Sequence, residues 1–270
     1  MVGTELINWI SASIAPLILV AARLGGLSIF APVLGSQVVN NKIKVFFFLG
    51  LSVATVPVLI ATGRIAGVEQ MGLWGLVAAI ILEVAIGALI GFIALMPMMA
   101  MQTGGLVMAQ QMGLGFARFY NPAMGDEADV LENLLFLLAL VTFISIGGID
   151  WMVLAVLNSY EYIAVGGFVP GTGVVTLLTG LVMSAFEIGL RVAAPLLALV
   201  FLETLAIGFI SKTVPQLNIL SLGFPIRIMV GLGTIVVGVV VLQQVLVEFI
   251  DVVLATMQDW IISGGGTAGG

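Results

Sequence analysis

Cysteine and histidine are both absent from the 270 residues of this sequence. Their absence excludes disulfides, thiol nucleophiles and imidazole acid–base catalysis, and it removes the usual ligands of zinc sites. The sequence also lacks a Walker-type or dinucleotide-binding glycine-rich loop with its required lysine or flanking strand. We therefore expect a protein that is not an enzyme and that binds no metal and no cofactor.

Charged side chains are scarce, at 8% of the residues, whereas hydrophobic residues make up 61%. A soluble domain carries far more charge, so this composition excludes a water-soluble globule. The 14 acidic and 8 basic residues are scattered rather than gathered in runs, which gives no support to nucleic-acid binding. The composition predicts an all-α membrane protein that contacts the lipid bilayer.

The hydrophobic residues form blocks that are long enough for membrane helices. A hydrocarbon core of about 30 Å needs about 20 mostly apolar residues in a helix. The third and fifth blocks are longer than this and approach or contain Pro97 and Pro195, so each either bends or forms two shorter helices. The second and fourth blocks are short for a membrane span, so half-inserted hairpins remain an alternative for them. The blocks are Leu6–Leu34, Val45–Ile60, Met71–Met101, Leu134–Ile149, Gly173–Ile210 and Ile226–Phe249.

The segments outside these blocks differ in character. The segment before Glu5 has no basic region and no small-residue cleavage site follows, so the first block is expected to be retained rather than removed as a secretory signal. Residues 211–225 contain two prolines and a glycine and are predicted to form an ordered loop. Residues 263–270 are glycine-rich and are predicted to be a flexible tail.

Five charged residues lie inside the apolar blocks, where a charge is costly and usually faces protein or water. Glu187 and Arg191 are four residues apart, so on a helix they share a face in the order that favours an ion pair. Two roles are open for these charges: structural neutralisation, within the chain or at subunit contacts, and a proton or substrate relay. The wide separation of the acids in the sequence favours structural neutralisation. The five residues are Arg23, Glu83, Glu187, Arg191 and Glu203.

Small and flexible side chains mark two further features. Gly87 and Gly91 have the four-residue spacing that lets helix backbones approach closely in a membrane. Seven of the 13 methionines lie between Met96 and Met124. Methionine is flexible and polarizable, so Met108 and Met112 are candidates for a seal; the alternative is that they fill the core or face lipid.

The segment that follows the methionines combines glycines with aromatic residues. Such a combination favours close contacts without regular helix geometry, although an interfacial aromatic belt is also compatible with it. Its notable residues are Gly113, Leu114, Gly115, Phe116, Phe119 and Tyr120.

Three groups of residues together carry a resemblance to a known family. They are Arg23, Pro32 and Lys42–Lys44; Gln110–Gly115 with Asn121 and Pro122; and Glu203 with Pro215, Asn218, Gly223, Pro225 and Arg227. The chain resembles the FliR family (FliR/SctT) of flagellar biosynthesis proteins and their counterparts in the type III secretion export apparatus. The resemblance covers nearly the whole chain before the glycine-rich tail, and its C-terminal motif is the most specific part.

This resemblance implies a core subunit of the flagellar or type III protein-export gate, in the bacterial inner membrane at the flagellar basal body. It implies assembly with FliP and FliQ, contact with FlhB, and passage of unfolded export substrates. It also implies a FliP-like part at residues 1–185, followed by a FliQ-like helical hairpin at residues 186–262, within a helical hetero-oligomeric gate. Some apolar blocks would then be buried against neighbouring subunits.

The family also implies a plug loop at about residues 110–131 that closes the channel before export. By position, this role is carried to Gly113, Leu114, Gly115, Phe116, Phe119 and Tyr120. Bulky aromatic side chains can block a lumen, and glycines allow the loop to move aside. A scaffold without a moving element would differ only in whether this loop opens.

The alternative function is a proton-coupled secondary transporter of a small solute, with Glu83 or Glu203 as the coupling acid. Transporters of this kind often contain two related halves with broken helices at matching positions. Pro97 and Pro195 match superficially, but the sequences that flank them do not repeat.

Overall fold

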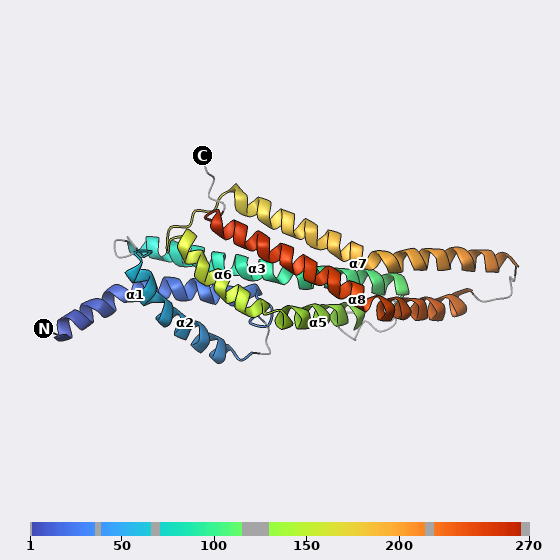
Figure 1. The fold of residues 1–270 in the computed structure, drawn as a ribbon, viewed down its shortest axis with the longest axis horizontal. Helices are drawn as coiled ribbons and strands as arrows, with labels where there is room; N and C mark the ends of the chain where they lie inside the picture. The colour runs from blue at the N-terminus through green and yellow to red at the C-terminus, as the bar shows by residue number, and fades with distance from the viewer. Residues whose placement is uncertain (1, 36–38, 66–70, 115–129, 214–218, 266–270) are drawn as a thin grey trace. The chain divides into compact units, whose positions relative to one another are not determined.

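The computed structural model describes residues 2–35, 39–65, 71–114, 130–213 and 219–265, and over these ranges it contains seven helices and no strand. This result confirms an all-α membrane protein. Four helices are long and apolar enough to cross a membrane, or up to five if α5 and α6 are counted as one broken span. The helices are α1 (Val2–Phe30), α2 (Asn41–Ala61), α3 (Leu73–Met112), α5 (Val130–Ser145), α6 (Gly148–Tyr162), α7 (Thr172–Thr213) and α8 (Ile219–Ile262) (Figure 1).

One helix, α6, was not predicted from the sequence, because Asp150, Asn158 and Glu161 interrupt its apolar pattern. The fourth apolar block corresponds to α5 and ends where α6 begins. Gly147 precedes α6 with a φ of 80°, a left-handed conformation that a glycine adopts without a steric penalty. Its carbonyl accepts a hydrogen bond from the Trp151 N–H at 3.1 Å, so α6 starts as a separate element.

Prolines do not divide the long helices. The helices α3 and α7, with 40 and 42 residues, continue through Pro97 and Pro195. The predicted loop at residues 211–225 was also wrong over its second half, because α8 begins at Ile219 and contains Pro225. A proline removes one backbone hydrogen bond, but apolar surroundings offer no water to the other backbone groups, so the helix is retained on both sides.

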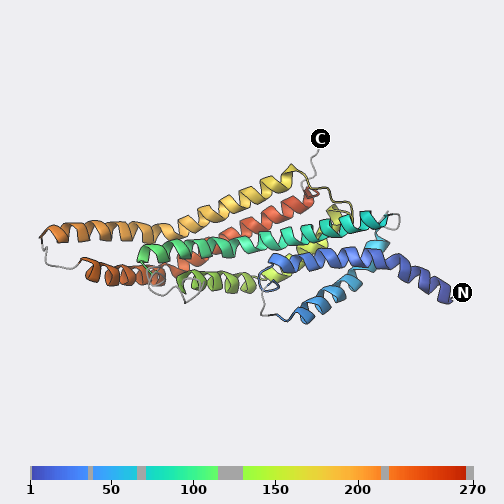
Figure 2. The ribbon, with the colours of Figure 1, turned by 180° about the vertical axis from the view of Figure 1, so that it is seen from behind.

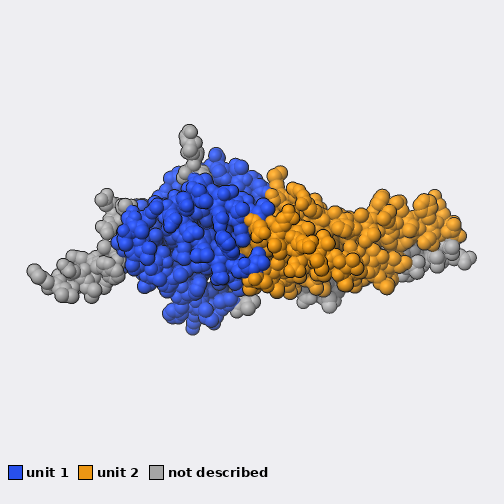
Figure 3. Space-filling view, in the orientation of Figure 1, with its two compact units in different colours: residues 1–95, 146–181, 252–270 blue, residues 96–145, 182–251 orange. Residues whose placement is uncertain are grey.

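The chain divides into two compact units (Figure 3). Unit 1 consists of Met1–Leu95, Ile146–Leu181 and Val252–Gly270, and unit 2 consists of Met96–Ser145 and Val182–Asp251. The helices α3, α7 and α8 therefore contribute residues to both. The division at residues 185 and 186 into FliP-like and FliQ-like parts stays a prediction.

In unit 1, α1 lies against both α2 and α3, and the views in Figures 1 and 2 agree on this. The contact with α3 is a backbone contact. A Cβ atom on Gly91 would lie 2.7 Å from the Leu27 carbonyl oxygen, and one on Gly87 would overlap the Arg23 carbonyl oxygen. These contacts confirm the close helix approach that Gly87 and Gly91 predicted.

In unit 2, α3 packs against α5 and α7 through glycines in the same way. A Cβ atom on Gly104 would lie 2.9 Å from the Gly189 carbonyl oxygen of α7. One on Gly105 would lie 2.8 Å from the Glu132 Cα atom of α5. The last turns of α7 and the first turns of α8 lie side by side in both ribbon views (Figures 1 and 2).

Candidate functional site

Arg23 is the largest polar side chain in the core of unit 1, and it is fully buried. Its Nε and Nη2 atoms donate to the two carboxylate oxygens of Glu83 on α3, at 2.5 and 3.0 Å. Its Nη1 atom donates to the Ser159 Oγ atom at 2.9 Å, and both Nη atoms donate to the Ile163 carbonyl oxygen at 3.2 Å. Five hydrogen bonds match the five N–H donors of a guanidinium group, so none is left unsatisfied.

Neighbouring backbone and aromatic groups also contact this ion pair. The Gly166 N–H donates to the Glu83 Oε1 atom at 2.8 Å, and the Arg23 guanidinium lies 4.3 Å from the Tyr160 ring centroid. The Tyr160 hydroxyl donates to the Val20 carbonyl oxygen at 3.2 Å. A buried charge is tolerated when it is paired and hydrogen-bonded in this way, and the pair joins α1, α3 and α6. We call Arg23, Glu83, Ser159, Tyr160, Ile163 and Gly166 the Arg23 cluster.

Glu187 and Arg191 form the ion pair that their spacing predicted, with 2.9 Å between Oε1 and Nη2. Their side chains are 69% and 60% exposed on α7. An exposed pair in water contributes little to stability, but the same pair facing hydrocarbon would be costly. This face of α7 therefore needs contact with water or with protein.

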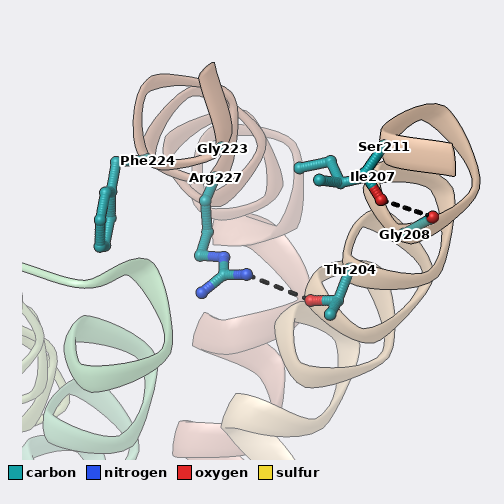
Figure 4. A pocket seen from close by; sticks show the side chains of 7 residues that line it. All are labelled: Thr204, Ile207, Gly208, Ser211, Gly223, Phe224 and Arg227. Atoms are coloured by element: carbon teal, nitrogen blue, oxygen red, sulfur yellow. Dashed lines mark hydrogen bonds between the residues drawn. The ribbon is translucent and has the colours of Figure 1, made fainter. Parts of the chain in front are cut away.

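Glu203 on α7 pairs with Arg227 on α8, with 3.2 Å between Oε2 and Nε. The Arg227 Nη2 atom also donates to the Thr204 hydroxyl at 3.1 Å, as Figure 4 shows. Glu203 is 8% exposed, yet its Oε1 atom has no hydrogen-bond partner among the described residues. Unlike the Arg23 cluster, this pair is held by one contact and is incomplete.

A pocket of about 290 Å³ lies beside this pair, between the last turns of α7 and the first turns of α8. Arg227 points into the space between the two helices in Figure 4. Thr204, Ile207 and Gly208 form the α7 wall, and Gly223 and Phe224 belong to the α8 wall. The pocket is an apolar recess with one cationic group.

The C-terminal motif lies only partly within the described structure. Gly223, Pro225 and Arg227 belong to the first turns of α8, so Gly223 and Pro225 are helical rather than part of the predicted loop at residues 211–225. Pro215 and Asn218 lie outside the described residues. The helix places Gly223 and Arg227 one turn apart, which is why both reach the same pocket.

Met108 and Met112 are both buried within unit 2, at the end of α3. A Cβ atom on Gly231 of α8 would lie 2.5 Å from the Met112 sulfur atom, so this glycine makes room for the methionine. Met108 lies beside an apolar groove of about 460 Å³ that Pro195 and Gly238 also line. Both side chains contribute to the packing of unit 2, and their sealing role stays a prediction.

The plug residues begin where α3 ends. Gly113 has a φ of 79°, its N–H donates to the Gln110 carbonyl at 3.1 Å, and the Leu114 N–H donates to the Ala109 carbonyl at 3.1 Å. This pair of bonds is the Schellman arrangement, which closes a helix on a left-handed glycine. The other predicted plug residues, Gly115, Phe116, Phe119 and Tyr120, lie outside the described residues.

Comparison with known proteins identifies the family. The sequence profile described as bacterial export proteins, family 1, matches residues 14–253. The chain belongs to this family. It is 29% identical over 227 residues to the flagellar biosynthetic protein FliR of Escherichia coli (strain K12), covering 84% of each chain. It is also 29% identical over 147 residues to the Yop proteins translocation protein T of Yersinia pestis, covering 54% of this chain and 56% of that protein.

These matches confirm the resemblance to the FliR family and make the chain a component of a bacterial export apparatus. The family profile covers the Arg23 cluster and the Glu203–Arg227 pair. Sequence reasoning missed the α6 side of the cluster, namely Ser159, Tyr160, Ile163 and Gly166. Ile163 and Gly166 contribute backbone groups, which carry no residue-specific pattern, so no sequence signal marks these two residues.

Proposed function

We propose that this export protein is a core subunit of the flagellar type III export gate in the bacterial inner membrane, at the flagellar basal body. It forms the channel entrance with FliP and FliQ, contacts FlhB and passes unfolded export substrates. Residues 1–185 form its FliP-like part and residues 186–262 its FliQ-like hairpin. The flagellar system is favoured because the similarity to Escherichia coli FliR covers 84% of the chain, against 54% for the Yersinia protein.

The observation that carries this proposal is the bare apolar surface of α7 and α8. With 42 and 44 residues, these helices are about 63 and about 66 Å long, twice the hydrocarbon thickness of about 30 Å. Only 17% of the most apolar stretch of α7 and 11% of that of α8 is buried within the chain. Lipid cannot cover these helices over their whole length, and water is a poor solvent for their apolar side chains. Partner subunits therefore cover the remaining apolar surface of α7 and α8.

The plug role of the central loop is supported by how its ends are held. The Gln102 side chain on α3 donates to the Glu132 Oε1 atom on α5 at 2.6 Å. Gly105 packs against the backbone of α5 beside this bond, and Gly113 closes α3. Residues 115–129 thus connect two helices that are fixed to each other, and fixed ends suit a loop that closes a lumen. Met108 and Met112 would support the seal from the end of α3.

The transporter alternative gains nothing from the geometry of its two candidate acids. Glu83 is 1% exposed and both of its oxygens accept hydrogen bonds in the Arg23 cluster. Glu203 is paired with Arg227. A coupling acid must exchange protons with water; Glu83 is kept from water by its burial and hydrogen bonds, and Glu203 is held against a cation.

Photo-crosslinking tests the proposed cover of α8. A photoreactive residue replaces Val237, which is 83% exposed, or Leu246, which is 1% exposed on the same helix, in a chain co-expressed with FliP and FliQ. We expect a crosslink to FliP or FliQ from position 237 and none from position 246. An assembled complex in which position 237 crosslinks to lipid alone would contradict the proposal.

Ion conductance tests the plug. The triple change Phe116→Ala, Phe119→Ala and Tyr120→Ala should make the assembled channel leak ions while its mass by native mass spectrometry stays unchanged. Phe46→Ala is the matched control, because Phe46 lies on α2 and is 76% exposed. Equal conductance of the triple variant and the control would remove the plug assignment.

A further inference from the structure

Unit 1 contains a recess that the proposed function does not use. It has a volume of about 300 Å³ and lies along α6, with the last turns of α8 as its other wall. On α6 it is lined by Trp151, Leu154, Asn158, Glu161 and Tyr162, among others. These positions are three, four and seven residues apart, so they share one face of the helix. We call this recess the α6 groove.

Polarity changes in order along the α6 groove. The carboxylate of Glu161 and the ring of Tyr162 lie at the C-terminal end of α6. One turn earlier is the amide of Asn158, and Gln258 of α8 adds a second amide to the lining. Leu154 and Trp151 follow, about 10 and about 15 Å from Glu161 along the helix axis. Along α6, the lining therefore passes from charge through a neutral hydrogen-bonding group to apolar surface, and Ile261 and Ile262 of α8 add apolar surface to the other wall.

The depth of this groove in the membrane follows from α2. With 21 residues, which are mostly apolar after Lys44, α2 is about 31 Å long, and this length matches one hydrocarbon thickness. Arg64 lies three residues after its end, at the level where lipid headgroups begin. The Arg64 Nη1 atom donates to the Glu161 carbonyl oxygen, so the C-terminal end of α6 lies at the same level. The charged end of the groove thus faces headgroups and its apolar end faces acyl chains.

The polar side chains of the groove are also free to bind. Among the described residues, Asn158, Gln258 and the Glu161 carboxylate have no hydrogen-bond partner. Arg64 uses one N–H group on Glu161, which leaves other guanidinium donors. A carboxylate and two amides are therefore available in the recess, and the Arg64 guanidinium is bonded to the backbone of Glu161 beside it.

We propose that the α6 groove binds an aminophospholipid. Glu161 accepts from the lipid ammonium group, and Arg64 at the rim neutralises the phosphate. The amides of Asn158 and Gln258 donate to the ester carbonyls, and an acyl chain lies against Leu154 and Trp151. The order of chemical groups in such a lipid is the order of the lining side chains along α6. This inference needs no partner subunit and is independent of the proposed function.

Native mass spectrometry of the delipidated chain in mild detergent tests the inference. Phosphatidylethanolamine and phosphatidylglycerol with identical acyl chains are titrated separately, because only the first has an ammonium group. We expect the wild-type chain to bind the ethanolamine lipid about fivefold more tightly, and Glu161→Gln to remove this preference. Arg64→Gln should weaken both lipids by about fivefold. Asp150→Asn is the control, since Asp150 is an exposed acid of α6 that does not line the groove.

A second measurement places the acyl chain. An ethanolamine lipid with brominated chains should quench tryptophan fluorescence, and Trp151→Phe should remove most of the quenching that saturates with lipid. Equal binding of both lipids by the wild-type chain would overturn the proposal. So would a preference that survives Glu161→Gln, or quenching that is unchanged in Trp151→Phe.

Discussion

The Arg23 cluster makes the sharpest energetic prediction, through the substitution Glu83→Ala. This change leaves the Arg23 guanidinium fully buried with no counter-charge, and it leaves the Gly166 N–H without an acceptor. Removing one partner of a buried ion pair typically costs about 3–5 kcal/mol, because the remaining charge stays out of water. We expect a loss of this size in the free energy of unfolding of the chain.

The assay is equilibrium unfolding in mild detergent, followed by the circular dichroism of the helices. Glu187→Ala is the matched control, because it breaks a pair that is 69% and 60% exposed, and it should cost less than about 1 kcal/mol. The double variant Arg23→Met with Glu83→Met should recover most of the loss, since apolar replacement of a whole buried pair is often neutral. A loss below about 1 kcal/mol for Glu83→Ala would refute the reasoning.

Two further predictions concern helix packing in each unit. Gly87→Ala places a methyl group against the Arg23 backbone of α1 and should lower the free energy of unfolding by more than about 3 kcal/mol. Gly50→Ala on α2 is the control, because its methyl group meets no atom within 4 Å and should be neutral or stabilising. Thermal unfolding of both variants checks this prediction. Arg227→Met should cost about 1–3 kcal/mol by leaving the Glu203 carboxylate unpaired, and adding Glu203→Met should restore stability in the same measurement. Equal stability of the alanine variants, or no recovery in the double variant, would count against these two packing interpretations.

The family and the class of fold could be predicted from the sequence because they depend on strong and extended signals. Apolar blocks of membrane length predicted helices wherever charges were absent, and α2, α3, α5 and α7 lie where blocks were expected. The prediction failed at α6, where Asp150, Asn158 and Glu161 interrupt the pattern. It also failed at the start of α8, where Gly223 and Pro225 were taken to end regular structure.

The ion pairs of the described residues show how far local patterns reach. Spacing along one helix was enough to predict the pair of Glu187 and Arg191, because residues four apart share a face. It could not pair Arg23 with Glu83, which are 60 residues apart, or Glu203 with Arg227, which lie on different helices. Arg23 donates five hydrogen bonds, and one of their acceptors is a backbone carbonyl oxygen, which no sequence pattern marks.

The sequence by itself determined that this chain is a helical membrane protein of a bacterial export family, because composition and motif residues are properties of the chain in one dimension. Only the tertiary structure decided which charges on different helices meet, which helix each small residue touches and which apolar faces stay bare. Each of these depends on residues from different helices converging in space. That convergence follows from packing α1 against α3 and α7 against α8, and no local pattern encodes it.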